Sequence, residues 1–231
     1  MKLKNRIQSF FSYFKKEKKE EKKKENVIFF DLTSSINNRK KNQKKDRKKI
    51  DHNPITKIKI KESALEKIFA ISKATDLECY CLLLGYDDIV EDIFVPLQEA
   101  NGVHVTVDGK NIMEIKEILK TTKYKVLGWA HSHCTFSVFF SSTDMQNQNT
   151  LLIQTQNYTK DYTKKWVYGM TVNHKREMIG YVSTQYADNF SIEMKKADIC
   201  IIKDIKNEDE KIKIKKIYQT MIHQKLNMLK Y

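Results

Sequence analysis

The pattern of hydrophobic and polar residues changes character near residue 55. Isoleucines alternate with lysines over 56–61, which predicts a strand with one apolar face. The segment 62–74 repeats apolar residues at helical spacing, and 79–86 is a continuously apolar run typical of a buried strand. The same criteria predict further strands at 89–97, 102–107, 124–131, 165–172, 177–185 and 197–203, and helices at 109–122, 142–154 and 208–231.

Strands interspersed with helices indicate a mixed α/β fold, in which helices flank a mixed β-sheet. We expect this domain to span 54–203. The segment 204–231 carries an apolar stripe and is predicted to form a C-terminal amphipathic helix. That helix either packs on its own domain or provides a contact with another protein.

Charge separates the first 53 residues from the rest of the chain. The formal net charge is +14, and residues 1–50 alone hold 18 Lys and Arg against 6 Asp and Glu. The remaining residues are therefore nearly neutral. We interpret 1–53 as a flexible basic arm attached to a neutral domain. No motif for specific nucleic-acid binding is present, so a lysine-rich arm would give only salt-dependent, sequence-independent binding.

The beginning of the basic arm is amphipathic. Apolar residues recur at helical spacing among lysines and an arginine over 3–16. This pattern predicts a helix that lies on an anionic membrane or docks on an acidic partner. The alternative is a frayed, partly helical tail.

Cysteine content and hydropathy indicate a cytoplasmic protein. Four cysteines are too few for a disulfide-based scaffold in a chain of 231 residues. No run approaches 18 consecutive apolar residues, and the apolar stretch 10–14 is too short for a signal peptide.

Candidate chemistry is concentrated in residues 128–144. His131 and His133 stand two positions apart at the end of a predicted strand, so both imidazoles can project to the same side. With an oxygen from Asp144, they form a three-ligand set that leaves a fourth tetrahedral zinc position for water. Zinc lowers the pKa of such a water to about 7.

A structural interpretation of the same residues is also open. The histidine pair could be structural, and Ser141 with Asp144 could form a helix N-cap with an acidic third residue. The two roles are compatible. A helix that begins at Ser141 would hold Asp144 toward the histidines.

The string H-x-H-x7-S-x2-D, preceded by Gly-Trp, resembles the signature of the JAMM (MPN+) zinc metalloprotease family. Upstream, Glu78 to Gly85 resembles the family pattern E-x-x-G-x-x-x-G, with Cys81 in place of the first glycine. The segments 95–98 and 102–107 are also similar, and the resemblance covers 55–203.

The resemblance implies a fold and a reaction. Members have a mixed sheet flanked by helices, and most hydrolyse isopeptide bonds after ubiquitin or ubiquitin-like tails. It implies one catalytic Zn²⁺ per chain, held by His131, His133 and Asp144. Glu78 would be the general acid/base, and the Ser141 hydroxyl would stabilise the oxyanion. Members often pair with a second copy or a relative, so a homodimer or an MPN-type partner is expected.

Two alternatives to an active zinc isopeptidase remain. The chain could be a non-catalytic MPN scaffold subunit of a larger complex. Cys134 stands where the family usually has proline, and a thiolate there could occupy the water position on zinc and silence the enzyme. Otherwise Cys134 is an ordinary loop cysteine. Cys79 and Cys81 are expected to be small core residues.

Overall fold

The computed structural model describes residues 55–101, 105–107, 112–122, 124–159, 166–185 and 191–228. The predicted basic arm and its helix at 3–16 lie outside these residues. The elements follow in the order β1 (Lys57–Lys61), α2 (Glu62–Lys73), β2 (Tyr80–Tyr86), β3 (Ile89–Phe94), β4 (Gln98–Ala100), β5 (Val105–Val107), α3 (Ile112–Thr122), β6 (Lys125–Ser132), α4 (Ser142–Thr159), β7 (Trp166–Val172), β8 (Met178–Gln185), β9 (Ile192–Ile202), α5 (Glu208–Lys225) and β10 (Leu226–Met228).

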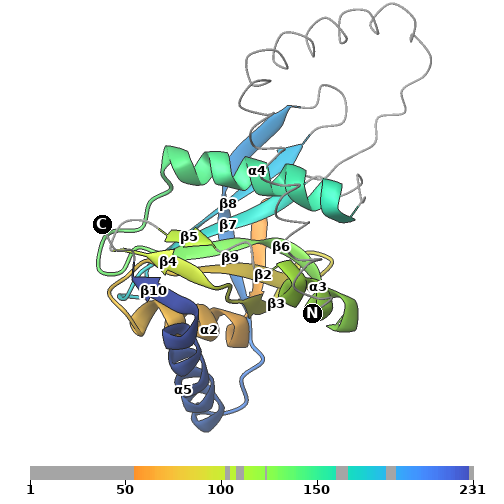
Figure 1. Cartoon of the computed structure of the whole chain (residues 1–231). Helices are drawn as coiled ribbons and strands as arrows, with labels where there is room; N and C mark the ends of the chain where they lie inside the picture. Colours follow the sequence, from red (N-terminus) through yellow and green to blue (C-terminus); the bar gives the residue numbers. More distant parts are fainter. Residues whose placement is uncertain are drawn as a thin grey trace, which may run out of the picture. The chain divides into compact units, whose positions relative to one another are not determined.

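Seven strands form a closed mixed barrel in the order β1-β3-β2-β6-β7-β8-β9. It closes because β1 pairs in parallel with both β3 and β9. A separate three-stranded sheet has the order β10-β4-β5. Figure 1 shows the barrel strands between α4 on one side and α2 with α5 on the other. The predicted mixed α/β fold with flanking helices is confirmed.

The core forms where the predicted apolar faces meet. Ile58 and Ile60 of β1 are fully buried, as the alternation with lysine requires. Helix α2 buries Leu65, Ile68 and Phe69 in the same core cluster. Each such side chain stabilises the fold by about 1.5–3 kcal/mol when fully buried. This cluster therefore supports β2 and β6, the two strands that carry the candidate chemistry.

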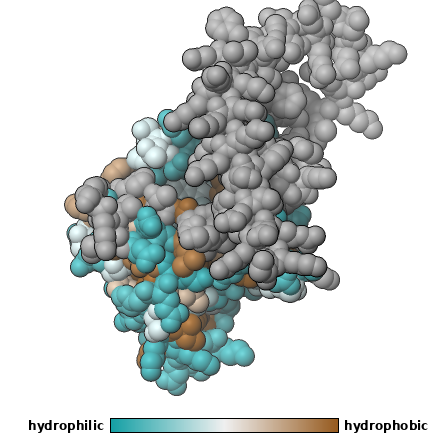
Figure 2. Space-filling model, in the orientation of Figure 1, coloured by the Kyte–Doolittle hydropathy of each residue, from teal (hydrophilic) through white to brown (hydrophobic). Residues whose placement is uncertain are grey.

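The C-terminal segment differs from its prediction. The predicted helix over 208–231 is wrong at 226–228, because the chain turns extended at Leu226 and β10 pairs in parallel with β4; residues 229–231 lie outside the described part of the chain. Helix α5 packs on its own domain through the fully buried Ile222. Ile217, which belongs to the predicted apolar stripe, is 48% exposed. Figure 2 shows hydrophobic residues reaching the surface in the region of α5.

Membrane-spanning helices are absent from the described part of the chain, where no helix is both long and apolar enough to cross a bilayer.

Gly128 lets β6 lie close against β7. A Cβ atom there would lie 2.2 Å from the carbonyl oxygen of Tyr168, and a backbone atom can retreat only if the strands separate. We expect Gly128→Ala to lower the free energy of unfolding by about 3 kcal/mol, measured by urea denaturation. Gly180→Ala is the matched control, because its Cβ would first meet the flexible end of Ile58. A larger loss of unfolding free energy in Gly180→Ala than in Gly128→Ala would contradict this account of the contact between β6 and β7.

Candidate metal centre

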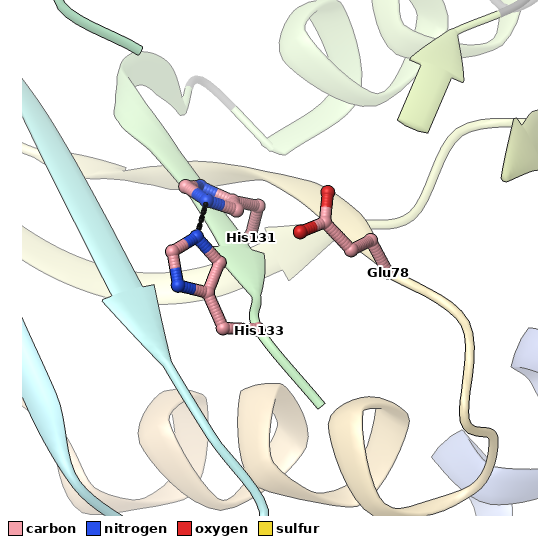
Figure 3. Close-up of side chains that lie close together, drawn as sticks. All are labelled: Glu78, His131 and His133. Carbon is pink, nitrogen blue, oxygen red and sulfur yellow. Dashed lines mark hydrogen bonds between the residues drawn. The ribbon is translucent and has the colours of Figure 1, made fainter. Parts of the chain in front are cut away.

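The two histidines of the motif converge at the end of β6. His131 lies within the strand and His133 directly follows it, where its backbone N–H donates to Val172 O at 2.9 Å and extends the pairing with β7. The two Nε2 atoms lie 2.9 Å apart, which confirms that both imidazoles project to the same side. Figure 3 shows them facing each other, with the Glu78 carboxylate pointing toward them.

Neighbouring groups fix both imidazole rings. The Nδ1 atom of His133 donates to Ser137 O at 3.0 Å, so its Nε2 is unprotonated and accepts from His131 Nε2 at 2.9 Å. Phe139 packs against this ring, with 4.5 Å between ring centroids. Trp129 stacks on His131 at 5.0 Å and 14°. Both rings are therefore held with Nε2 toward the same point.

His131 is neutral at physiological pH. Burial lowers the pKa of its imidazole to about 4, assisted by the neighbouring His133 and partly opposed by the Asp144 carboxylate. A neutral imidazole is the form that binds a metal ion.

Glu78 reaches the histidines from the segment before β2. Its backbone N–H donates to Asn101 O at 2.9 Å, and β2 runs antiparallel to β6 with Tyr80 opposite His131. The potential ligand atoms of Glu78, His131 and His133 all lie within 4.8 Å of one another. Burial, and secondarily the Asp144 charge, raise the pKa of Glu78 to about 7. This carboxyl group can therefore take up and release a proton near neutral pH.

Ser141 and Asp144 form the N-terminal cap of α4. Asp144 Oδ2 accepts from the backbone N–H and the hydroxyl of Ser141, both at 2.7 Å, and Ser141 Oγ accepts from Asp144 N–H at 3.1 Å. The other carboxylate oxygen, Asp144 Oδ1, lies 3.8 Å from His131 Nε2. The cap therefore points Asp144 at the histidines, as the sequence suggested, although Asp144 lies outside the tighter group that contains Glu78.

An open cavity of about 750 Å³ gives access to these residues. All five residues predicted from the sequence line it: Glu78, His131, His133, Ser141 and Asp144. Its rim is apolar. Phe136 and Phe139 are 57% and 55% exposed, and Val107 of β5 is 41% exposed.

Cys134 is a buried thiol in a turn. Its φ of 48° is one that proline cannot adopt, because the proline ring holds φ near −65°. Burial, with the nearby Glu78 and Asp76 carboxylates, raises the pKa of this thiol to about 11. Cys134 is also absent from the group of potential metal ligands found in the described residues. These observations favour an ordinary loop cysteine over a fourth ligand. The prediction that Cys79 and Cys81 are core residues is confirmed.

Two buried amides beside the site were missed in the sequence. Gln148 of α4 is fully buried and donates to Val167 O and Tyr181 O at 3.3 and 3.4 Å, which ties the helix that carries Asp144 to β7 and β8. Asn173 is fully buried after β7 and contacts the loop that follows His133. Gln148 has no local signal, because its amide bonds to the backbone of distant strands. Asn173 also accepts from nearby Lys175 and Glu177, but its bond to Phe136 O spans 37 positions and has no local signal.

Comparison with known proteins identifies the domain. Residues 53–159 match the model of the JAB1/Mov34/MPN/PAD-1 ubiquitin protease family. A JAB1/MPN domain protein from Archaeoglobus fulgidus is 16% identical, with a TM-score of 0.35 over 64% of this chain and 99% of that one. A structure described as JAMM, a metalloprotease-like zinc site in the proteasome and signalosome, is 18% identical, with a TM-score of 0.34 and the same coverage. No curated protein sequence matches. The chain therefore carries a domain of the JAB1/Mov34/MPN/PAD-1 family.

Proposed function

We propose that this protein is a zinc-dependent isopeptidase that hydrolyses ubiquitin or ubiquitin-like conjugates. The observation that carries the proposal is the convergence of potential ligand atoms of His131, His133 and Glu78 within 4.8 Å at an open cavity, with the two Nε2 atoms 2.9 Å apart. Two histidines with the Asp144 carboxylate, whose Oδ1 lies 3.8 Å from His131 Nε2, are a donor set that suits zinc and leaves a position for water beside Glu78. The family match to a ubiquitin protease model supports the choice of substrate.

His131, His133 and Asp144 are the proposed ligands of one zinc ion per chain. His133 presents an unprotonated Nε2, because its Nδ1 donates to Ser137 O. Asp144 presents Oδ1, because its Oδ2 is occupied by the cap of α4. Zinc bound here would polarise the scissile carbonyl group and lower the pKa of a bound water to about 7.

Glu78 is the proposed general base and acid. One of its carboxylate oxygens would take the proton of the attacking water and later deliver it to the leaving lysine amine. Efficient transfer in both directions requires a group whose pKa lies near the working pH. Burial gives Glu78 this property, since it raises the pKa of the carboxyl to about 7.

Ser141 is the proposed donor to the oxyanion. In the structure its hydroxyl donates to Asp144 Oδ2, and we propose that it turns toward the substrate carbonyl oxygen as negative charge develops there. Asp144 Oδ2 would keep its bond from the Ser141 backbone N–H during this turn. The backbone part of the cap would therefore survive the movement of the hydroxyl.

The apolar rim of the cavity fits an extended polypeptide tail. Exposed Phe136 and Phe139 on one loop, together with Val107, offer contacts for apolar side chains beside the scissile bond. The cysteines are free thiols, which suits a reducing compartment such as the cytoplasm.

The test is to incubate zinc-loaded full-length protein with a panel of ubiquitin and ubiquitin-like isopeptide conjugates. We expect about one zinc ion per chain by metal analysis, release of the free modifier from at least one conjugate, and loss of release after chelation. A zinc-free protein would contradict the metal centre. A zinc-loaded protein that cleaves no conjugate in the panel would contradict the isopeptidase and favour a scaffold.

A further inference from the structure

The loop between β6 and α4 carries His133 and the two exposed phenylalanines of the rim. Its backbone begins in an unusual conformation, because Cys134 has a φ of 48° in the left-handed region. A non-glycine residue holds this conformation only when its surroundings fix it. Besides its internal hydrogen bonds, the loop is held by contacts from another part of the chain.

Those contacts come from the turn between β7 and β8, residues 173–177, which we name the β7–β8 turn. The His174 backbone N–H donates to Cys134 O at 2.7 Å. The side-chain amide of Asn173 donates to Phe136 O at 2.9 Å. These two bonds hold the carbonyl groups on either side of the first turn of the loop.

Asn173 is itself fixed on every side. It is fully buried, and its Oδ1 accepts from the backbone N–H groups of Lys175 and Glu177 at 3.1 and 3.0 Å. Its Nδ2 also contacts Glu177 Oε2 at 2.5 Å. Because the oxygen faces two donors and the nitrogen faces two acceptors, the amide has one orientation that satisfies all partners.

The β7–β8 turn is anchored to the core on its other side. Arg176 forms a charge-assisted pair with the buried Glu66 of α2, and its guanidinium lies 4.2 Å from the ring centroid of Phe69. Burial acts to raise the pKa of Glu66, but the Arg176 and Lys211 charges lower it on balance, so the pair stays ionised. Asn173 therefore acts from a rigid support.

The chain of contacts ends on His133. Asn173 holds Phe136 O, which fixes the peptide plane that leads into Ser137. Ser137 O in turn accepts from His133 Nδ1 at 3.0 Å, and Phe136 N–H donates to His133 O at 2.8 Å. The Ser137 carbonyl favours the Nδ1–H tautomer and this ring orientation of His133, and the contact with His131 Nε2 is compatible with both.

We propose that Asn173 is a positioning residue for His133. By donating to Phe136 O, it holds the Ser137 carbonyl where it accepts from Nδ1–H and keeps Nε2 unprotonated, the form that binds a metal ion. The link to zinc affinity rests on the proposed function, whereas the link to the His133 tautomer does not.

The test variant removes the side-chain N–H donor of residue 173 and keeps the size and shape of the side chain. Asn173→Asp retains an acceptor for Lys175 and Glu177, but sets a carboxylate against Phe136 O and against the Glu177 carboxylate. Adding Glu177→Gln removes the charge repulsion and restores a hydrogen bond within the turn. This double variant still leaves Phe136 O without its donor, so it separates turn stability from loop positioning.

A second buried amide provides the matched control. Gln98 is 1% exposed, and its amide donates to Tyr80 O and Pro96 O at 3.1 and 3.2 Å. Gln98→Glu therefore also replaces a buried amide donor by a carboxylate. No contact of Gln98 with the loop after His133 is present among its hydrogen bonds in the described residues.

Two measurements on the full chain report on His133. In metal-free protein, ring ¹⁵N shifts from long-range ¹H–¹⁵N spectra should show a His133 with its proton on Nδ1, and the double variant should show an averaged tautomer. Zinc affinity by chelator competition should fall about tenfold in the double variant, the lower end of the range for groups that orient a ligand. Gln98→Glu should change neither property, even if its melting temperature falls.

Unchanged His133 shifts and zinc affinity in the double variant would overturn the proposal, as would equal changes in Gln98→Glu. If neither Asn173 variant folds, the test is the hydrogen-exchange rate of the Asn173 side-chain amide protons in the unaltered chain. Rapid exchange would mean that the bond to Phe136 O does not persist and would overturn the proposal. If the unaltered chain binds no zinc, the proposed function fails, while the His133 shifts still test the positioning role.

Discussion

Glu78→Gln is expected to remove most turnover and to leave zinc bound. The amide fills the same space as the carboxyl but cannot take a proton from water. General acid–base groups contribute roughly 100- to 10,000-fold, and we expect a loss of kcat in that range on a cleavable conjugate. Burial disfavours the charged form of Glu78, as its raised pKa shows, so the neutral amide should not lower the melting temperature.

Glu99→Gln is the matched control for this substitution. Glu99 lies on β4, is exposed and does not line the cavity, so its replacement should leave kcat unchanged. Full turnover in Glu78→Gln would contradict the role of Glu78 in proton transfer. Loss of zinc would instead make Glu78 a ligand, a role that its place within 4.8 Å of both histidines permits.

Features that depend on local geometry could be predicted from the sequence. The burial of Ile58 and Ile60 follows from strand alternation alone, and the same alternation places His131 and His133 on one side. The cap formed by Ser141 and Asp144 involves residues three positions apart, so its spacing is visible in the sequence. Local rules therefore specified four of the five candidate residues.

Features that depend on distant segments could not be predicted in this way. Glu78 reaches the histidines only through the register of β2 with β6, and the sequence placed it there by family resemblance alone. Leu226 continues an apolar helical stripe, yet it becomes extended because β4 offers hydrogen bonds to β10. Asn173 acts on Phe136 O, 37 positions away. Such pairings leave no periodic pattern near either residue.

Asp144→Asn is expected to remove zinc binding while preserving the start of α4. The asparagine oxygen can still accept from the Ser141 backbone N–H, so the cap should survive. A neutral amide is a much weaker zinc ligand than a carboxylate. We expect zinc affinity to fall by more than about 100-fold, since loss of a ligand should exceed the effect of losing a group that orients one.

Ser141→Ala is the counterpart that separates the cap from the metal. It removes the hydroxyl that accepts from Asp144 N–H, which should lower stability by about 1 kcal/mol and reduce turnover, but Asp144 Oδ1 stays free to bind zinc. If Asp144 is a ligand, chelator competition should therefore show a lowered zinc affinity for Asp144→Asn and an unchanged zinc affinity for Ser141→Ala. If Asp144→Asn instead keeps full zinc affinity, Asp144 serves only as a cap, and the ligand set is Glu78 with the two histidines.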